Sequence, residues 1–176
     1  MDRYMEQVVV KQNRTLNEIA YVLSLVMMIV LGLFALLEIN MIFYAFSVPL
    51  LIELLLLAGS TVLLYFYRPR LRTEYEYTFT NGDLDFAMVF NNQKRKNLGS
   101  LNVRNVDAFG PVNGQAFQRY ISMQGVKQTR WFLNRDAELY YFYFQKENNK
   151  RIIILEPNEE LVDYIKQYLP YGAYQA

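Results

Sequence analysis

The stretch that decides the fold is IAYVLSLVMMIVLGLFALL, residues 19–37. It carries no charge, and its only hydroxyl groups belong to Tyr21 and Ser24. As a helix it spans roughly 28 Å at about 1.5 Å per residue, which matches a bilayer hydrocarbon core of about 30 Å. The run therefore predicts a transmembrane helix rather than the buried helix of a soluble domain. It is also longer than the apolar core of a cleaved signal peptide.

A second apolar run extends from residue 41 to residue 67 and contains one charge, at Glu53. As a single helix it would reach roughly 40 Å, which exceeds the thickness of a bilayer core. Proline is tolerated in the first turn of a helix and disrupts its interior, so Pro49 places the second spanning helix at about Val48–Tyr67. Residues 39–47 then form an interfacial connection. A continuous helix kinked at Pro49 is the alternative.

The distribution of basic residues predicts the orientation. No Lys or Arg occurs between residues 15 and 67. Basic residues flank this gap on both sides: Lys11, Arg14, Arg68, Arg70 and Arg72. Because Lys and Arg near helix ends stay cytoplasmic, residues 18–67 are expected to form a transmembrane hairpin in the cell membrane. The protein is then multi-pass, with both termini in the cytoplasm.

The cytoplasmic N-terminal segment, residues 1–17, offers two patterns. Four apolar side chains share one face if the segment is helical: Tyr4, Met5, Val8 and Val9. Such a face could lie on the inner membrane surface, although a frayed terminus is equally compatible. Thr15-Leu16-Asn17-Glu18 fits a capping box, in which the Thr15 hydroxyl and the Glu18 carboxylate satisfy backbone donors at the start of the helix.

After Arg68-Pro69-Arg70 the pattern changes, and residues 73–170 are predicted to form a separate cytoplasmic domain of strands. Apolar and polar side chains alternate, and Asn81-Gly82 predicts a tight hairpin because both residues tolerate positive φ. Residues 112–125 are ambiguous. The expected strands, about seven, lie near residues 75–80, 84–90, 97–102, 105–111, 126–133, 138–145 and 151–155.

The last predicted element is a helix, with Asn158 as its N-cap and acidic residues in its first turn. Its apolar side chains recur at helical spacing, which predicts that this face packs on the sheet. They are Leu161, Tyr164, Ile165, Tyr168 and Leu169. Pro170 ends the helix, and residues 171–176 are expected to be a tail.

This order of elements resembles the pleckstrin-homology (PH) superfold. Three stretches resemble a family of bacterial two-helix membrane proteins with a C-terminal PH-like domain: YEYTFTNGDLD at 75–85, KRK at 94–96 and EPNEE at 156–160. The resemblance implies an α+β membrane protein, in which a two-helix transmembrane hairpin precedes a seven-stranded antiparallel β-barrel or sandwich with a C-terminal helix. In PH-like domains, basic residues of the first hairpins sometimes bind anionic headgroups. Here the basic run follows the second strand.

Composition excludes several kinds of chemistry. The chain has no Cys and no His, so disulfides, thiolate nucleophiles and histidine-based catalysis or metal binding are impossible. The net charge is +1, and no basic helix is evident, which argues against nucleic-acid binding. We therefore expect a protein that is not an enzyme and that uses no cofactor and no metal.

Two kinds of charged site remain candidates. Lys94, Arg95 and Lys96 either solvate a loop tip or contact anionic lipid at the inner leaflet, together with Arg68, Arg70 and Arg72. Glu53 is a possible intramembrane polar site, because carboxylates are costly inside a bilayer. It also lies close enough to the predicted start of its helix to reach the outer interface.

The aromatic run at residues 140–144 lacks polar alternation. Such a strand is either buried on both faces or presents an aromatic surface, and the face away from the last helix needs a cover. The candidates are the membrane, a partner or the loop at residues 112–125, so Tyr141 and Tyr143 are possible protein contacts. The sequence thus predicts a membrane-tethered, non-enzymatic interaction or scaffold module that binds a protein partner or itself. An inner-leaflet sensor of anionic lipid is the alternative.

Overall fold

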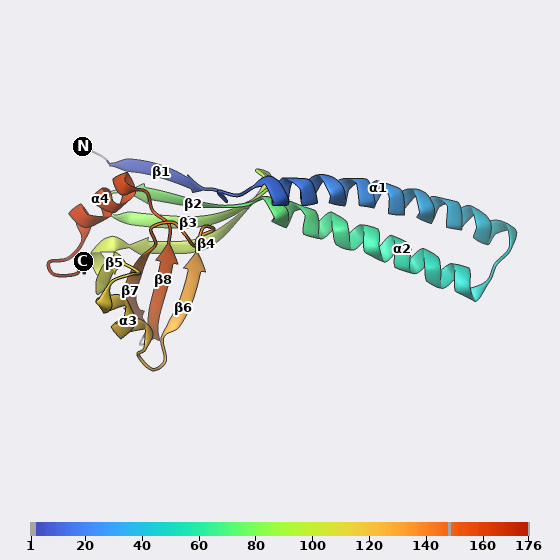
Figure 1. Ribbon diagram of the computed structural model, residues 1–176. Coiled ribbons are helices and arrows are strands. Elements are labelled where there is room, and N and C mark those ends of the chain that lie inside the picture. Colours follow the sequence, from blue (N-terminus) through green and yellow to red (C-terminus); the bar gives the residue numbers. More distant parts are fainter. Residues whose placement is uncertain (1–2, 148, 176) are drawn as a thin grey trace. The chain divides into compact units, whose positions relative to one another are not determined.

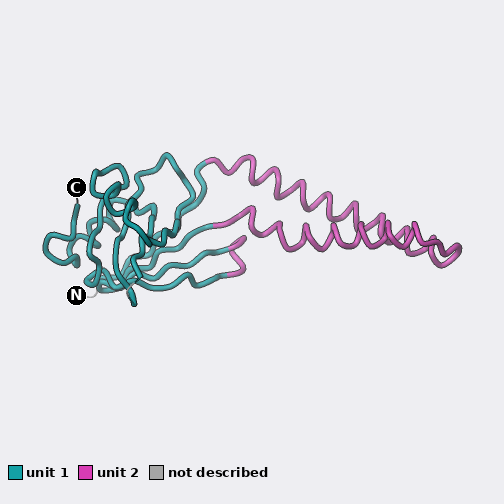
Figure 2. The backbone as a smooth tube through the Cα atoms, turned by 90° about the horizontal axis from the view of Figure 1, so that it is seen from below, with its two compact units in different colours: residues 1–12, 74–89, 95–176 teal, residues 13–73, 90–94 magenta. Residues whose placement is uncertain are grey.

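The computed structural model describes residues 3–147 and 149–175, which divide into two compact units (Figures 1 and 2). The first unit comprises the segment up to Gln12, residues 74–89 and the chain from Arg95 onward. The second comprises residues 13–73 and 90–94. The first unit is discontinuous because the second interrupts it.

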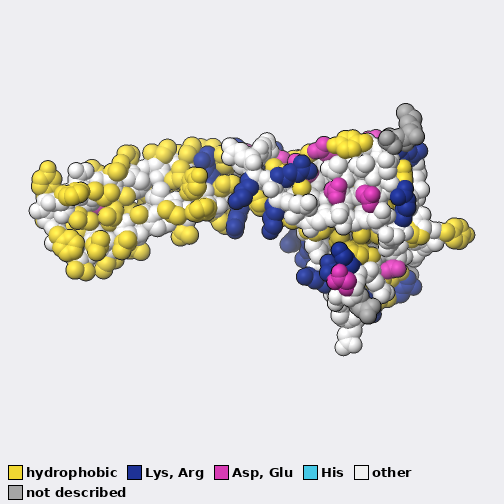
Figure 3. Space-filling view, turned by 180° about the vertical axis from the view of Figure 1, so that it is seen from behind, with side chains coloured by type: hydrophobic (Ala, Val, Ile, Leu, Met, Phe, Trp, Pro, Cys, Tyr) yellow, Lys and Arg dark blue, Asp and Glu magenta, His cyan; other side chains and the backbone are white. Residues whose placement is uncertain are grey.

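The second unit is a pair of long helices. Helix α1 runs from Thr15 to Tyr44, α2 from Val48 to Tyr67, and the 3₁₀ helix η1 from Arg68 to Arg72. Both α1 and α2 are long and apolar enough to span a membrane by length and composition, and none of their residues is buried. Apolar side chains dominate their surface (Figure 3).

Pro49 lies in the first turn of α2, which confirms the predicted start of that helix. The prediction of an interfacial connection over residues 39–47 is largely wrong, because α1 continues to Tyr44 and only residues 45–47 connect the helices. No Pro or Gly lies between Glu38 and Pro49, so no helix breaker in the sequence ends α1 earlier.

The first unit contains two open four-stranded sheets. The first sheet has the order β1-β2-β3-β4, and the second has the order β5-β7-β8-β6. The strands of the first sheet are Tyr4–Val9, Thr73–Thr80, Asp83–Phe90 and Lys94–Asn102. Strands β5 to β8 are Ala108–Pro111, Lys127–Trp131, Tyr140–Lys146 and Asn149–Leu155. Short helices follow β4, β5 and β8, namely η2 (Val103–Asn105), α3 (Gln115–Ile121) and α4 (Glu159–Tyr168).

This architecture corrects part of the predicted seven-stranded antiparallel barrel or sandwich. The sheets are not closed into a barrel, β6 runs parallel to β8, and the described residues form eight strands. The additional strand is β1, in the segment expected to be a helix or a frayed terminus. Its apolar side chains fit helical spacing, but they also include the β-branched pair Val8 and Val9, which suits a strand that pairs with β2.

Strand β1 pairs antiparallel with β2, from Tyr4 opposite Thr80 to Val9 opposite Tyr75. The helices therefore interrupt a β-hairpin. The first sheet is built from chain on both sides of the helices, and residues 73–170 alone do not contain the whole unit. The Asn81-Gly82 turn is confirmed, because both residues have positive φ, 51° and 100°.

The main core of the first unit contains inward-facing side chains of the first sheet and side chains of α4. Leu161, Val162 and Ile165 are buried, which confirms the predicted packing of this helix. The side chain of Asn158 accepts a hydrogen bond of 2.8 Å from the Leu161 N–H, as expected for an N-cap. The chain after α4 is not a free tail, since the Phe109 N–H on β5 donates to the Ala173 carbonyl at 2.8 Å.

Candidate functional site

The outer face of the first sheet, the face turned away from the core, is acidic. Inward side chains of β2 such as Tyr77 are fully buried, so alternation turns their neighbours outward. The register places Glu6 opposite Thr78 and Val8 opposite Glu76 on this outer face. Five carboxylates share it: Glu6, Glu74, Glu76, Asp83 and Asp85. Such a face attracts cationic groups and repels anionic ones.

Arg95 is the cation on this face. Its guanidinium lies 2.8 Å from the Glu76 carboxylate, although the two residues belong to β4 and β2. Ala87, on the intervening strand β3, is small and lets the arginine reach across. Ala87 and Arg95 line a shallow open depression together with Thr78 and Asp85.

The basic run at residues 94–96 therefore does not act as one cluster. Strand alternation turns Lys94 and Lys96 to the opposite side from Arg95, and both lysines are exposed. Because Arg95 is paired with Glu76, two of the three cations remain as candidates for lipid contact.

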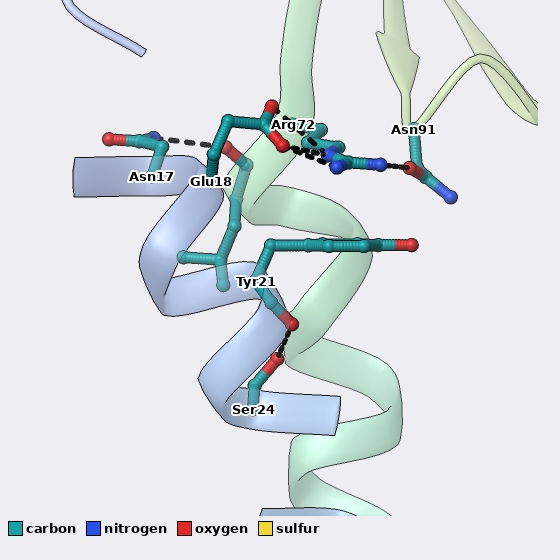
Figure 4. A network of polar contacts seen from close by, with 7 residues as sticks. Asn17, Glu18, Tyr21, Ser24, Arg72 and Asn91 are labelled. Atoms are coloured by element: carbon teal, nitrogen blue, oxygen red, sulfur yellow. Dashed lines mark hydrogen bonds and ion pairs between the residues drawn. The ribbon is translucent and has the colours of Figure 1, made fainter. Parts of the chain in front are cut away.

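At the base of the helices, Arg72 connects α1 to the turn between β3 and β4 (Figure 4). Its guanidinium forms an ion pair with Glu18 of α1 and donates a hydrogen bond of 3.3 Å to the Asn91 side-chain oxygen. The Arg72 carbonyl also accepts a 2.8 Å hydrogen bond from the Asn91 N–H. The predicted capping box is wrong, because Glu18 binds Arg72, and the N-cap residue, Arg14, makes no side-chain capping bond.

Tyr21 of α1 lies against two of the predicted cations. Arg72 Cζ is 3.7 Å and Arg68 Cζ 4.1 Å from the centroid of its ring, both within the range of a cation–π contact. Arg68 Nε is buried and has no hydrogen-bond partner among the described residues, and Arg70 is exposed. Of the three arginines of η1, Arg72 is thus neutralised by a carboxylate, whereas Arg68 and Arg70 have no ion pair in residues 3–147 and 149–175.

A family model described as a bacterial PH-like domain (DUF6106) matches residues 1–175. The chain belongs to this family. The match includes the two helices as well as the strands on both sides of them, so the interrupted PH-like unit is covered as a whole. No curated protein matches the chain, and no solved structure matches it.

In this PH-like protein, the expected aromatic contact surface is covered. Tyr141 and Tyr143 are 0% and 4% exposed, so the prediction that they contact a partner is wrong. Helix α3 lies over them: the ring centroids of Phe117 and Tyr141 are 5.2 Å apart, and those of Tyr120 and Tyr143 are 4.4 Å apart. Of the three predicted covers, the segment at residues 112–125 is the one observed.

Burial has a chemical consequence for Tyr141. Its hydroxyl has no hydrogen-bond partner among the described residues. Desolvation of the anionic form raises the pKa of Tyr141 to about 12. The residue is a neutral core side chain at physiological pH.

Glu53, the predicted intramembrane polar site, is exposed on α2 and has no ion pair in the described part of the chain.

A polar network that the sequence analysis missed lies inside the PH-like unit. The Glu156 carboxylate accepts hydrogen bonds from the Leu133 and Asn134 N–H groups at 3.2 and 3.0 Å, and from the Asn134 side-chain amide at 2.7 Å. Asn134 is 8% exposed, and its side chain also holds the backbone of Val10 and Gln12. This network fixes the chain directly after β1.

Tyr77 extends the network. Its hydroxyl donates to the Trp131 carbonyl and accepts a hydrogen bond of 3.3 Å from the Glu156 N–H. Burial is the main reason that the pKa of Tyr77 is raised above its ordinary value. The sequence shows Asn134 as a turn residue and Glu156 as the residue before a proline. Neither pattern carries a signal for a long-range contact.

Proposed function

We propose that this protein is a membrane-tethered, non-enzymatic interaction module, in which α1 and α2 cross the cell membrane and the PH-like unit binds a protein partner in the cytoplasm. The observation that carries the proposal is the insertion of two long apolar helices, neither of which has a buried residue, between the paired strands β1 and β2. Core helices of soluble proteins bury such surfaces, so the lipid bilayer is the environment that these helices fit.

Pairing of β1 with β2 also supports a hairpin of two membrane-spanning helices. Val9 and Tyr75 are directly opposite, so the chain leaves and re-enters the sheet at neighbouring positions. The segment between them must therefore return to the side of the membrane on which it started, and two spanning helices do so. Lys and Arg flank the helices and are absent between residues 15 and 67, which supports a cytoplasmic location for that side.

The charges favour a protein ligand over a lipid ligand. The outer face of the first sheet carries five carboxylates, and its arginine is already paired with Glu76. Anionic headgroups would be repelled by this face. Each exposed lysine near an anionic surface contributes about 1 kcal/mol, so Lys94 and Lys96 together supply roughly 2 kcal/mol, too little for stable binding of an isolated domain.

A sensor of anionic lipid is the second candidate, and Arg68 and Arg70 favour it. Both belong to η1, directly after α2, and neither has an ion pair within the described residues. Phospholipid phosphates would neutralise them. The tether already holds the PH-like unit at the membrane, however, so lipid affinity would add little to localisation.

Site-specific photocrosslinking distinguishes the candidates. A photoreactive side chain replaces Asp85, which is exposed on the outer face, and Gln145, which is exposed on β7 of the other sheet, serves as the control. In native membranes we expect protein adducts from position 85 and few from position 145. Phospholipid adducts alone from position 85 would refute the proposal and favour the lipid sensor.

A further inference from the structure

The described residues of the PH-like unit form four edge strands, and an edge strand offers unpaired backbone N–H and C=O groups to other chains. Strands β1 and β4 are the edges of the first sheet, and β5 and β6 those of the second. Natural proteins protect such edges with lysines, bulges, short strands or a covering segment.

Three of the four edges are protected. Strand β4 begins with Lys94, Arg95 and Lys96 and contains Gly99 at a φ of 130°. The C-terminal segment covers β5, because Phe109 exchanges backbone hydrogen bonds of 2.8 Å with Ala173 and Gln175. Strand β6 has five residues, among them Lys127 and Arg130.

Within residues 3–147 and 149–175, strand β1 lacks these protections. From Tyr4 to Val10 the sequence contains no Lys, Arg, Pro or Gly. The Asn81 N–H donates to the Arg3 carbonyl at 3.0 Å, so Arg3 and Asn81 form a hydrogen-bonded pair. Hydrogen-bonded pairs alternate along an antiparallel ladder, and the backbone groups of Tyr4, Glu6 and Val8 therefore point away from β2.

The open part of the β1 edge is short and carries both apolar and acidic side chains. At its far end the Asn134 side chain already binds the Val10 carbonyl and the Gln12 N–H, so the open part extends from Tyr4 to Val8. Tyr4 and Val8 are 62% and 47% exposed, and Glu6 lies between them. An occupant would contact apolar side chains at both ends and a carboxylate in the middle.

We propose that an extended, basic segment of a partner protein adds to this edge as a fifth strand of the first sheet. The inference rests on the proposed function, and it names the surface of the PH-like unit that binds the partner and the chemistry of that partner. Alternate side chains of the added strand lie on the acidic outer face, where lysine or arginine would be close to Glu6. A second copy of β1 is disfavoured, because it would extend one acidic face with another.

The test uses the full-length protein in a zwitterionic detergent and a fluorescent peptide of about seven residues that alternates lysine with valine or threonine. Val8→Pro removes an outward N–H and leaves the ladder with β2 intact. Val8→Thr, which keeps that N–H and the β-branched shape, is the matched control. We expect anisotropy to show equal binding by wild type and Val8→Thr, and binding at least about tenfold weaker by Val8→Pro. A peptide with glutamate in place of lysine should not bind.

Hydrogen exchange locates the peptide and provides a second criterion. Binding should slow exchange of the Tyr4, Glu6 and Val8 amides. If Val8→Pro fails to fold, Glu6→Lys replaces it as the test variant. Glu6→Lys should weaken binding of the lysine peptide. Absent binding by wild type, unchanged binding by folded Val8→Pro or by Glu6→Lys, or protection of other amides instead would overturn the proposal. Protein adducts from position 85 that persist in Val8→Pro would leave the proposed function standing while the β1 edge is rejected.

Discussion

Because β1 and β2 form an interrupted hairpin, the helices should be removable. Replacing residues 13–72 by a short Asn-Gly turn would join Gln12 to Thr73, close to the point where Val9 faces Tyr75. We expect the joined protein to be soluble and to unfold cooperatively. Residues 73–176 alone lack β1 and should be much less stable.

The structure gives the size of this difference. Loss of β1 removes the buried Val9, which is worth about 1.5–3 kcal/mol. It also removes two hydrogen bonds of the Gln7 side chain, to the Glu156 carbonyl and from the Asn158 N–H, both 2.9 Å long. At about 0.5–1.5 kcal/mol each, they bring the loss to roughly 2.5–6 kcal/mol. That is a large part of the stability of a small domain, about 5–15 kcal/mol.

Urea denaturation measures the difference. Circular dichroism reports the sheets, and fluorescence reports Trp131, the one tryptophan of the chain, whose ring lies 4.5 Å from that of Phe86. The joined protein should show one transition by both probes, at a clearly higher urea concentration than residues 73–176. Equal midpoints for the two proteins would refute the reasoning, because β1 would then contribute nothing to the unit.

Three further changes test the core and the helix base. Ile165→Asp in the joined protein should cost more than about 3 kcal/mol and abolish the thermal transition, because Ile165 is fully buried, whereas Gln167→Asp on the exposed face should not; a retained transition would exclude α4 from the core. Tyr141→Phe should leave stability unchanged or raise it by about 1 kcal/mol, since the hydroxyl is buried without a partner among the described residues. The unfolded tyrosine ionises near pH 10 and the folded one near 12, so wild type should lose stability between these values, and Tyr141→Phe should lose less; identical alkaline denaturation curves would contradict this. Arg72→Gln and Glu18→Gln should each lower the stability of the full-length protein in detergent by about 1 kcal/mol or less, since both side chains are more than a third exposed. The double variant should be little less stable than either single variant. Additive losses in thermal unfolding would mean that the two side chains are not energetically coupled.

Local patterns predicted much of the fold. The placement of Pro49 defined the start of α2, Asn81-Gly82 defined the β2–β3 turn, and the apolar stripe of α4 identified its buried face. In each case the physical cause lies within a few residues of the feature. A short-range pattern is therefore sufficient to predict it.

Features that depend on distant parts of the chain could not be predicted in this way. The segment containing Val8 and Val9 fits helical and strand spacing equally, and β2, more than sixty residues later, decides between them. Likewise, Glu18 has the spacing of a capping box, but Arg72 competes for its carboxylate. Tyr141 could be recognised as needing a cover, although its burial by α3 depends on a segment without a clear local pattern.

Cysteine accessibility tests the central claim most directly, that two spanning helices interrupt a cytoplasmic PH-like unit. The natural chain has no Cys, so each introduced thiol is a single label. Ala45 lies between α1 and α2, and Tyr4 and Tyr171 are exposed near the two ends of the chain. In intact cells, a membrane-impermeant maleimide should label Ala45→Cys, whereas Tyr4→Cys and Tyr171→Cys should react only after permeabilisation. Labelling of Tyr4→Cys or Tyr171→Cys in intact cells would contradict the account.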